Sequence, residues 1–419
     1  LKTLFWARDV RGGAGERDTF RIFMSHLVSL GHGWMIRKNL SLIPEYGRWD
    51  DLWIFLDIPE LRLDVIDLIK SQLKKDACAE RPSLLAKWLP SENASSLESK
   101  RLARIIRTGI GLSSQDYRKV LSGLRSTINI VEKKMSSRQW DEINYEHVPS
   151  RAAMLYKDAF KKNDEARYTK YLVEVSNGEK KINAGTLFPY EIIKRYLRNG
   201  SARVNEFDAT LEALWTSLPN YVTEFDDSLV IADTSSSMDG TPMEVSISLA
   251  MYMSERNKGP WHNLFINFDD KPTLNRIVGD TLQQKLMSIC QVAWGGSTNI
   301  EAAFDLILNT AVQNNLTQDQ LVKRLFIVSD MEFNQANRNG YASIAQETLF
   351  RTISKKFEDK GYTMPSLVFW NVRASNAQFP MSLQDSNFVN ISGSSPSILR
   401  YMFTGVKMDA VETMLSVLN

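Results

Sequence analysis

Hydrophobic positions in the first 225 residues follow the period of an α-helix. In the segment 61–73, Leu61, Val65, Leu68 and Ile69 recur at spacings of three and four residues, which places them on one face of a helix. Turn residues separate such segments at intervals of roughly 10 to 18 residues. No strand is apparent in this half. We therefore expect an all-α array of HEAT-like helical repeats, curved or closed into a ring, without a strict sequence repeat.

The pattern changes near residue 226. Short apolar runs now alternate with helical segments, and the runs are DSLVIAD, HNLFINF, RLFIVSD, SLVFWNV and NFVNI. Continuous apolar strands between helices are typical of a parallel sheet that is covered on both faces. The sequence thus predicts two domains, an α-helical repeat domain over 1–225 and a doubly wound, Rossmann-like α/β domain over 226–419. Sheets of this kind bind ligands beyond the carboxyl ends of their strands.

Composition agrees with a soluble protein of two domains. The chain has 419 residues, which is more than one hydrophobic core usually serves. It has neither an apolar run long enough to cross a membrane nor a secretory signal. Its two cysteines, Cys78 and Cys290, and four scattered histidines argue against a disulfide framework and a zinc site. We expect a reducing compartment, the cytoplasm, and we expect that a natural N-terminal stretch precedes Leu1.

Charge differs between the two halves. Residues 1–225 contain 36 Lys and Arg against 29 Asp and Glu, whereas residues 226–419 contain 15 against 20. The surplus is concentrated in residues 101–200, with 20 basic and 11 acidic side chains. A basic surplus on helices is typical of a surface that binds a polyanion. The alternative is a solvated helical surface with a modest positive bias.

Oxygen-bearing side chains occupy three strand-to-helix junctions of the predicted α/β domain. The strand LVIAD ends in DTSSS, which contains Asp233, Ser235 and Ser237; Thr298 lies in the loop WGGSTN, and Asp330 ends the strand RLFIVSD. Because these junctions lie at the carboxyl edge of one sheet, the set indicates a site for a hard divalent cation such as Mg²⁺. The alternative for each loop is a turn with a helix cap.

The three loops resemble the metal-ion-dependent adhesion site (MIDAS) of von Willebrand factor A (vWA) domains. DTSSS, the Thr of GGSTN and the Asp of IVSD stand in the order of that motif. The resemblance implies that Mg²⁺ or Mn²⁺ is held by Asp233, Ser235, Ser237, Thr298 and Asp330. It also implies that the cation binds an acidic group of a partner protein, which is ligation rather than catalysis. The loop lacks the second carboxylate of aspartyl-phosphate hydrolases, since Ser235 stands at that position.

The likeness extends along most of the chain. LFWARDVRGGAGERD, GRWDDLW, LLAKWLPSEN, VEKKMSSRQWDEINYEHVPS, INAGTLFPYEI, ERNKGPWHNLFINF and SDMEF resemble a family known as a domain of unknown function. That family is similar to the TROVE proteins, the class of the Ro autoantigen, in which a ring of helical repeats is closed by a vWA domain. Ro-type proteins bind small noncoding RNAs on a basic surface and single-stranded RNA ends in the ring. The resemblance implies a non-enzymatic ribonucleoprotein component.

Charge selects the side chains that would contact RNA, because phosphate contacts need accessible Lys or Arg. The candidates are Lys100, Arg104, Arg107, Arg118, Lys119, Lys133, Lys134 and Arg138. Trp140, Tyr145, Tyr156 and Tyr168 could stack on unpaired bases. Aromatic side chains at helical spacing more often belong to a core.

Two other functions are compatible with these features. In a structural or assembly protein, the metal site would bridge neighbouring chains and the basic face would serve packing. In a metal-dependent phosphoesterase, Asp233 and Asp330 would surround the cation, although the sequence shows no positioned base.

The glycine cluster RGGAGER does not match a nucleotide-binding loop, because its glycines lack the G-x-G-x-x-G spacing and no strand precedes it. It predicts a loop between helices, fixed by ion pairs among Arg8, Arg11, Glu16 and Arg17.

Overall fold

The computed structural model of the chain describes residues 1–9, 11–128, 130–198, 201–204, 206–222, 227–292, 299–330, 342–373 and 388–393, together with Ile398 and Leu415. It divides into two compact units, residues 1–144 (unit 1) and residues 145–408 (unit 2).

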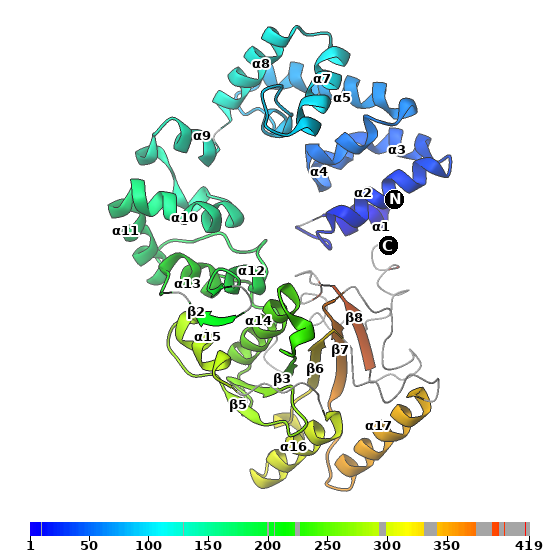
Figure 1. The fold of residues 1–419 in the computed structure, drawn as a ribbon, viewed down its shortest axis with the longest axis vertical. Coiled ribbons are helices and arrows are strands. Elements are labelled where there is room, and N and C mark those ends of the chain that lie inside the picture. Colours follow the sequence, from blue (N-terminus) through cyan, green and yellow to red (C-terminus); the bar gives the residue numbers. More distant parts are fainter. Residues whose placement is uncertain are drawn as a thin grey trace. The chain divides into compact units, whose positions relative to one another are not determined.

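Unit 1 is helical throughout its described residues (Figure 1). Leu61, Val65 and Ile69 are fully buried in its core, as their helical spacing predicts, and Pro59 begins their helix in the first turn, where its missing N–H costs no hydrogen bond. The helices are α1 (Lys2–Arg8), α2 (Arg17–Ser29), α3 (Gly33–Asn39), α4 (Ile43–Tyr46), α5 (Pro59–Ala77), α6 (Leu85–Trp88), α7 (Leu97–Ile110), α8 (Ser114–Thr127) and α9 (Val131–Ser136), with 3-10 turns at Leu40–Leu42, Trp49–Phe55 and Trp140–Glu142.

A buried ion-pair cluster joins the first helices of unit 1. Arg8 Nε donates to Asp51 Oδ2 at 2.8 Å, and Arg21 Nε donates to Asp51 Oδ1 at 2.7 Å. Both Arg8 and Asp51 are almost completely buried. The expected pairing of Arg8 with Glu16 is therefore wrong, because the arginine points into the core rather than along its own loop. Gly47 is required beside the cluster, since a Cβ there would lie 2.5 Å from Asp51 Oδ2.

Unit 2 begins with further helices and a short hairpin. Its strands β1 (Leu197–Arg198) and β2 (Ser201–Val204) pair antiparallel, so the prediction that the first half contains no strand is wrong. The hairpin was missed because two residues of strand are too few to show a period. The other elements here are a 3-10 turn at Tyr145–His147, α10 (Ser150–Asn163), α11 (Glu165–Ser176), α12 (Pro189–Ile193) and α13 (Ala209–Thr216).

The division between the two units differs from the predicted boundary at 225/226. Helices α12 and α13 pack on α14 (Thr241–Arg256) and α15 (Leu282–Cys290) within unit 2. The Trp215 indole donates to Glu255 at 2.8 Å, and Glu212 accepts from the backbone N–H of Leu282 at 2.7 Å. The change from helices to a sheet comes where the sequence predicts it, at Ser228, but packing ties the preceding helices to the sheet.

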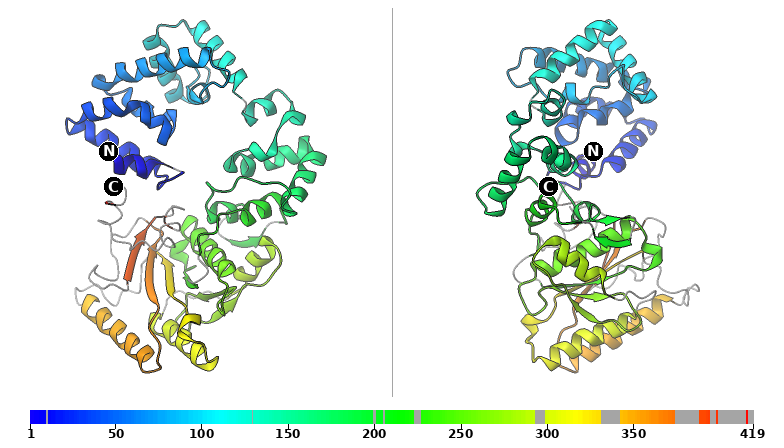
Figure 2. Two further views of the ribbon diagram at one scale, coloured as in Figure 1. Left: turned by 180° about the vertical axis from the view of Figure 1, so that it is seen from behind. Right: turned by 60° about the vertical axis from the view of Figure 1, so that its left-hand side comes forward.

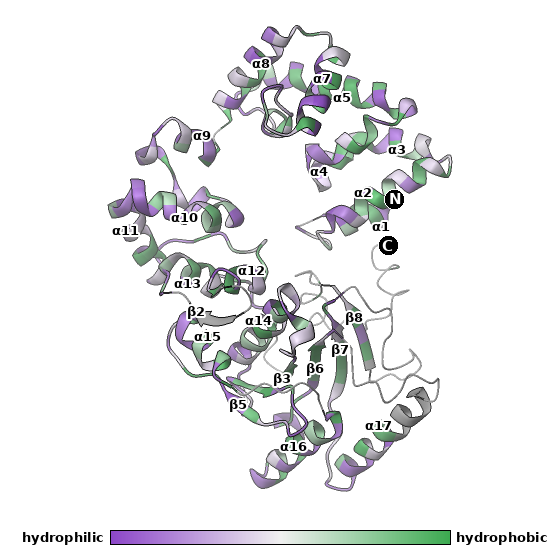
Figure 3. Cartoon of the chain, in the orientation of Figure 1, coloured by the Kyte–Doolittle hydropathy of each residue, from purple (hydrophilic) through white to green (hydrophobic). Residues whose placement is uncertain are grey.

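A six-stranded sheet forms the centre of unit 2. Its order is β5-β4-β3-β6-β7-β8, and every strand is parallel to its neighbours except β5. This confirms the predicted α/β sheet, to which the antiparallel β5 is added at one edge. Figure 3 shows the hydrophobic residues of β3, β6 and β7 at its centre. The strands are β3 (Ser228–Ala232), β4 (Leu264–Asn267), β5 (Leu274–Arg276), β6 (Arg324–Ser329), β7 (Ser366–Asn371) and β8 (Phe388–Ser392).

Helices cover both faces of this sheet. Helices α16 (Ile300–Gln313) and α17 (Ala342–Glu358) pack on one face, where Phe304 and Phe357 join a core with Leu229, Ile327 and Phe369. The two helices lie on the same side of the strands in Figure 2. Helix α14 contacts β3, β4 and β6 and is buried from Glu244 to Ser254. The strands are thus buried on both sides, which explains their unbroken apolar sequences.

No helix among the described residues combines the length and the apolar character that a membrane span requires.

Candidate functional site

Two carboxylates lie at the carboxyl ends of neighbouring strands in unit 2. Strands β3 and β6 run parallel with Ala232 opposite Val328, so Asp233 and Asp330 leave the sheet at the same edge. Both carboxylates are 1% exposed. Two buried acids of like charge at one edge are unfavourable without compensation by a cation or hydrogen bonds. Two of the five predicted metal ligands thus lie at one edge of the sheet, while cation binding there stays a prediction.

Hydrogen bonds fix Asp233 in the loop that follows β3. Its Oδ1 accepts from the backbone N–H of Ser235 at 2.9 Å, and its Oδ2 accepts from the Ser329 hydroxyl at 2.6 Å. Burial raises the pKa of the Asp233 carboxyl above its ordinary value, and the charge of Asp330 acts in the same direction. The hydrogen bonds from Ser329 and Ser235 oppose this rise. A divalent cation would relieve the same unfavourable burial of charge.

The two serines of the loop have the spacing that a small divalent cation needs. Ser235 Oγ and Ser237 Oγ are 3.1 Å apart. Adjacent ligands of an octahedral Mg²⁺, each at roughly 2.1 Å, are separated by about 3.0 Å. The described residues contain no cluster of three or more His, Cys, Asp or Glu side chains suited to a metal. A cation here would therefore depend on hydroxyl and water oxygens beside two carboxylates, a donor set that fits Mg²⁺ or Mn²⁺.

Thr298, the remaining predicted ligand, lies outside the described residues. The structure describes the junction from Asn299, whose side chain accepts from the N–H of Ala302 at 3.0 Å and caps α16. The position of the threonine relative to Asp233 stays a prediction.

Sequence reasoning missed an arginine at this edge of the sheet. Arg373 follows β7, the strand beside β6, and its Nη1 lies 3.9 Å from Asp330 Oδ2. The same guanidinium donates to the backbone carbonyl of Ser237. Its place directly after the strand SLVFWN was the available signal, because the carboxyl ends of parallel strands share one edge.

The predicted RNA-contacting residues of unit 1 fall into two groups. Arg104 and Lys119 are exposed, and neither side chain has a hydrogen bond or ion pair within the described part of the chain. Arg107 pairs with Glu92 at 2.8 Å and donates to the carbonyl of Leu112 at 2.9 Å. Those contacts connect α7 to its neighbouring loops. The Arg107 guanidinium therefore stabilises the fold and is already occupied by protein groups. Arg107 thus differs from Arg104 and Lys119, whose side chains are exposed.

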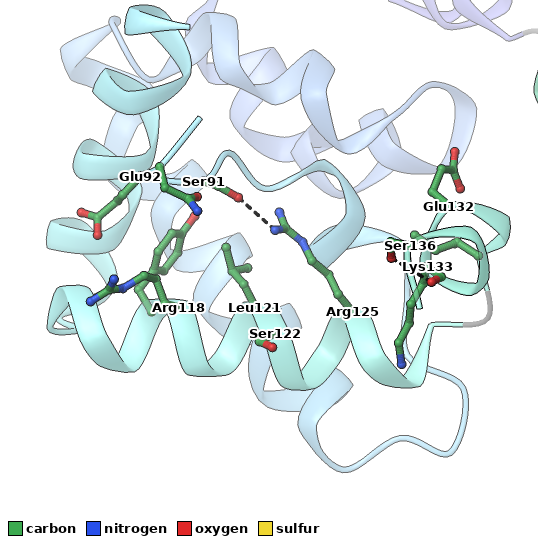
Figure 4. Close-up of a pocket in the computed structure, with 12 residues that line it drawn as sticks. Ser91, Glu92, Arg118, Leu121, Ser122, Arg125, Glu132, Lys133 and Ser136 are labelled. Atoms are coloured by element: carbon green, nitrogen blue, oxygen red, sulfur yellow. Dashed lines mark hydrogen bonds between the residues drawn. The ribbon is translucent and has the colours of Figure 1, made fainter. Parts of the chain in front are cut away.

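The other candidates differ in how far they are held. Lys100 is half-buried, and Arg138 is exposed with a left-handed backbone of φ 60°. Lys134 donates to the backbone carbonyl of Glu142. Arg118 and Lys133 line a groove of about 530 Å³ that lies wholly within unit 1 (Figure 4). Two of the predicted basic residues, Arg118 and Lys133, thus lie in a groove rather than on an open helical surface.

The aromatic candidates are mainly core residues. Tyr145 and Tyr168 are buried, and their ring centroids are 4.9 Å apart. Both pack on Phe160 in the same cluster. Trp140 and Tyr156 are half-buried. Tyr145 and Tyr168 are therefore unavailable to stack on bases, as their helical spacing suggested.

These observations define a class of protein with a helical unit and an α/β unit whose sheet edge carries a carboxylate and hydroxyl cluster. Two family models match the chain, each described as a domain of unknown function: DUF2828 over residues 111–224 and DUF7788 over residues 227–417. The two matches meet close to residue 226, where the sequence pattern changes.

Uncharacterized protein L728 of Acanthamoeba polyphaga mimivirus is 31% identical over 460 residues, and the match covers 100% of this chain and 79% of the viral protein. The chain belongs to the family of that protein. Among solved structures, the Ro (RSR) protein of Deinococcus radiodurans is similar with a TM-score of 0.41 and 14% identity, and the match covers 88% of this chain and 83% of that one.

Proposed function

We propose that this protein is a non-enzymatic, Ro-like RNA-binding protein with a vWA-type α/β domain. Unit 1 binds RNA through its basic side chains. The carboxyl edge of the sheet in unit 2 holds Mg²⁺ or Mn²⁺, and the cation receives an acidic group of a partner protein. The observation that carries the cation part is the 3.1 Å separation of the Ser235 and Ser237 hydroxyls beside two buried carboxylates.

In this proposal, each residue of the loop has a separate task. Ser235 and Ser237 hold the cation directly, and Asp233 and Asp330 neutralise it directly or through water, with Thr298 as the fifth ligand position. When bound, the cation supplies a Lewis-acidic position for a carboxylate oxygen of the partner. The Ser329 hydroxyl orients Asp233, and such orienting contacts commonly matter nearly as much as the ligands.

RNA binding through unit 1 is supported by exposed cations without partners. Arg104 lies on α7 and Lys119 on α8, and both are exposed. Neither forms an ion pair with any described carboxylate, so approach of a phosphate would not first have to break one. Each phosphate contact also releases counterions, which makes the affinity depend on salt.

We expect the double variant Arg104→Ala/Lys119→Ala to bind RNA less tightly than the wild type. Two lost phosphate contacts should make the slope of log affinity against log salt shallower by roughly 1.4 for a single strand. Fluorescence anisotropy with a structured RNA that has a single-stranded 3′ tail, over a salt series, measures both quantities. Lys161→Ala/Lys162→Ala is the matched control, since it removes two exposed cations from α10.

An unchanged affinity and slope in Arg104→Ala/Lys119→Ala would show that these two side chains do not contact RNA. Negligible binding by the wild type near physiological salt would contradict the RNA-binding function itself.

A further inference from the structure

The groove in unit 1 contains an arginine that sequence reasoning did not single out. Arg125 lies on α8, and Figure 4 shows its guanidinium directed toward Ser91 across the groove. The volume of about 530 Å³ lies within the range of roughly 300–1,000 Å³ that is usual for small-ligand sites. The groove is lined by Ser91, Glu92, Asn93, Tyr117, Arg118, Leu121, Ser122, Arg125, Ile130, Glu132, Lys133 and Ser136.

Neutral groups hold the Arg125 guanidinium in place. It donates to the carbonyls of Ala86 and Leu89 at 2.8 and 2.7 Å, and to the Ser91 hydroxyl at 2.9 Å. Burial lowers the pKa of Arg125 from its ordinary value, which reflects the cost of placing this charge away from water. A guanidinium carries five N–H donors, so these bonds leave two of them for a ligand. Arg125 is thus a rigid cation without a carboxylate partner among the described residues.

The other charges of the groove do not compensate Arg125. Arg118 Nε donates to the carbonyl of Ser114 at 3.3 Å, and Lys133 Nζ donates to the carbonyl of Ser126 at 2.7 Å. The two acids of the groove already pair with cations that do not line it. Glu92 pairs with Arg107 at 2.8 Å, and Glu132 pairs with Lys87 at 3.4 Å. The three cations of the groove therefore donate hydrogen bonds only to neutral groups among the described residues, although the charge of Glu92 also acts on Arg118.

The groove also has an apolar side chain between its cations. Ile130 is half-buried at its side, whereas Leu121 and the ring of Tyr117 are buried beneath it and form its floor. Cationic groups beside an apolar surface match the chemistry of a nucleotide, which has an anionic phosphate and a flat base. Figure 4 shows Arg118 at one end of the groove and Lys133 at the other. Cations spread in this way suit successive phosphates of a strand better than one phosphate group.

We propose that this groove binds consecutive nucleotides of single-stranded RNA, with Arg118, Arg125 and Lys133 contacting phosphates and Ile130 contacting a base. The proposal rests on the RNA-binding function proposed above and assigns it a site. Arg125 is held rigidly within the groove, whereas Arg118 and Lys133 contact the RNA strand at the two ends of the groove.

The test compares two double variants that each remove two positive charges. Arg118→Ala/Lys133→Ala changes the groove, and Lys161→Ala/Lys162→Ala changes exposed lysines of α10. A fluorescein-labelled decauridylate is titrated with each full-length protein over a salt series. We expect the groove variant to bind at least about tenfold more weakly than the control, with a salt slope shallower by roughly 1.4.

A third variant, Arg125→Lys, separates charge from geometry. Lysine keeps the positive charge but lacks the planar fork that bonds Ala86, Leu89 and Ser91. We expect weaker binding of the strand with an unchanged salt slope. Because Arg125 also supports the loop, the Arg118→Ala/Lys133→Ala comparison decides the proposal.

Three outcomes would overturn the proposal in distinguishable ways. If the groove variant binds like the control while the wild type binds well, the groove is wrong and RNA binding stands. If the wild type fails to bind the strand but binds uridine 5′-monophosphate by calorimetry, and the groove variant does not, the ligand is a free nucleotide. If neither probe binds the wild type, the groove is rejected, and the RNA-binding function is then decided by the structured RNA with its single-stranded 3′ tail.

Discussion

Replacing Asp51 by alanine is expected to lower the free energy of unfolding of unit 1 by about 3–5 kcal/mol, the usual loss when one partner of a buried ion pair is removed. Asp51 is completely buried and accepts from Arg8, Arg21 and the backbone N–H of Arg48. Its loss would leave the Arg8 guanidinium, only 2% exposed, without the carboxylate that compensates its charge. Chemical denaturation followed by tryptophan fluorescence measures the change.

The neighbouring residue provides a matched control for Asp51→Ala. Asp50 accepts from Arg21 at 2.8 Å but is 19% exposed, so water can replace it as a partner. We expect Asp50→Ala to cost about 1 kcal/mol. Equal and small losses in the two variants would contradict the interpretation that Asp51 anchors the first helices.

This cluster joins two segments that lie far apart in the sequence within the core of unit 1. Arg8 belongs to LFWARD, Asp51 belongs to GRWDDLW, and Gly47 leaves room between them. The sequence suggested that Arg8 pairs with Glu16, because it shows only which charged residues lie near each other along the chain. Partners 43 residues apart are determined by packing, which the hydrophobic pattern does not specify.

The α/β sheet was the most predictable part of the fold. Strands β3, β6 and β7 are buried on both faces, so each appears as an unbroken apolar run that ends in a polar residue or is followed by one. The same property located Asp233 and Asp330 at one edge, since parallel strands end together. The hairpin of β1 and β2 had a weaker signal, the dipeptide Asn199–Gly200, which favours a tight turn between strands.

The proposed binding surfaces could be predicted in charge but not in geometry. Arg107, Arg118 and Arg125 all belong to the basic segment 101–200, yet Arg107 pairs with an acid and Arg125 is fixed by carbonyls. Whether an arginine is available to bind a ligand depends on the partner groups that other segments bring near it in the folded protein. Arg373 was missed at the sheet edge for a related reason, because a single arginine after a strand is common.

The second large effect concerns the cation. We expect Mn²⁺ or Mg²⁺ to stabilise the wild type by about 2.7 kcal/mol when its concentration is a hundred times the dissociation constant. Asp233→Asn should weaken cation binding by at least about tenfold, because the loss of a residue that merely orients a metal ligand already costs about 10–100-fold. Thermal melts with EDTA and with Mn²⁺, together with electron paramagnetic resonance of free Mn²⁺, measure both changes.

In the absence of a cation, Asp233→Asn should no longer make the protein less stable than the wild type. Asp233 is 1% exposed, and burial and the charge of Asp330 both disfavour its carboxylate, so an uncharged amide at this position should leave the cation-free protein at least as stable as the wild type. Asp239→Asn is the matched control, since this exposed residue follows the same loop and should leave binding unchanged. A wild type whose melting temperature is the same in EDTA and Mn²⁺ would exclude a cation site at this edge. The buried acid pair would then require another explanation, and Arg373, 3.9 Å from Asp330, is a described cation that could supply it.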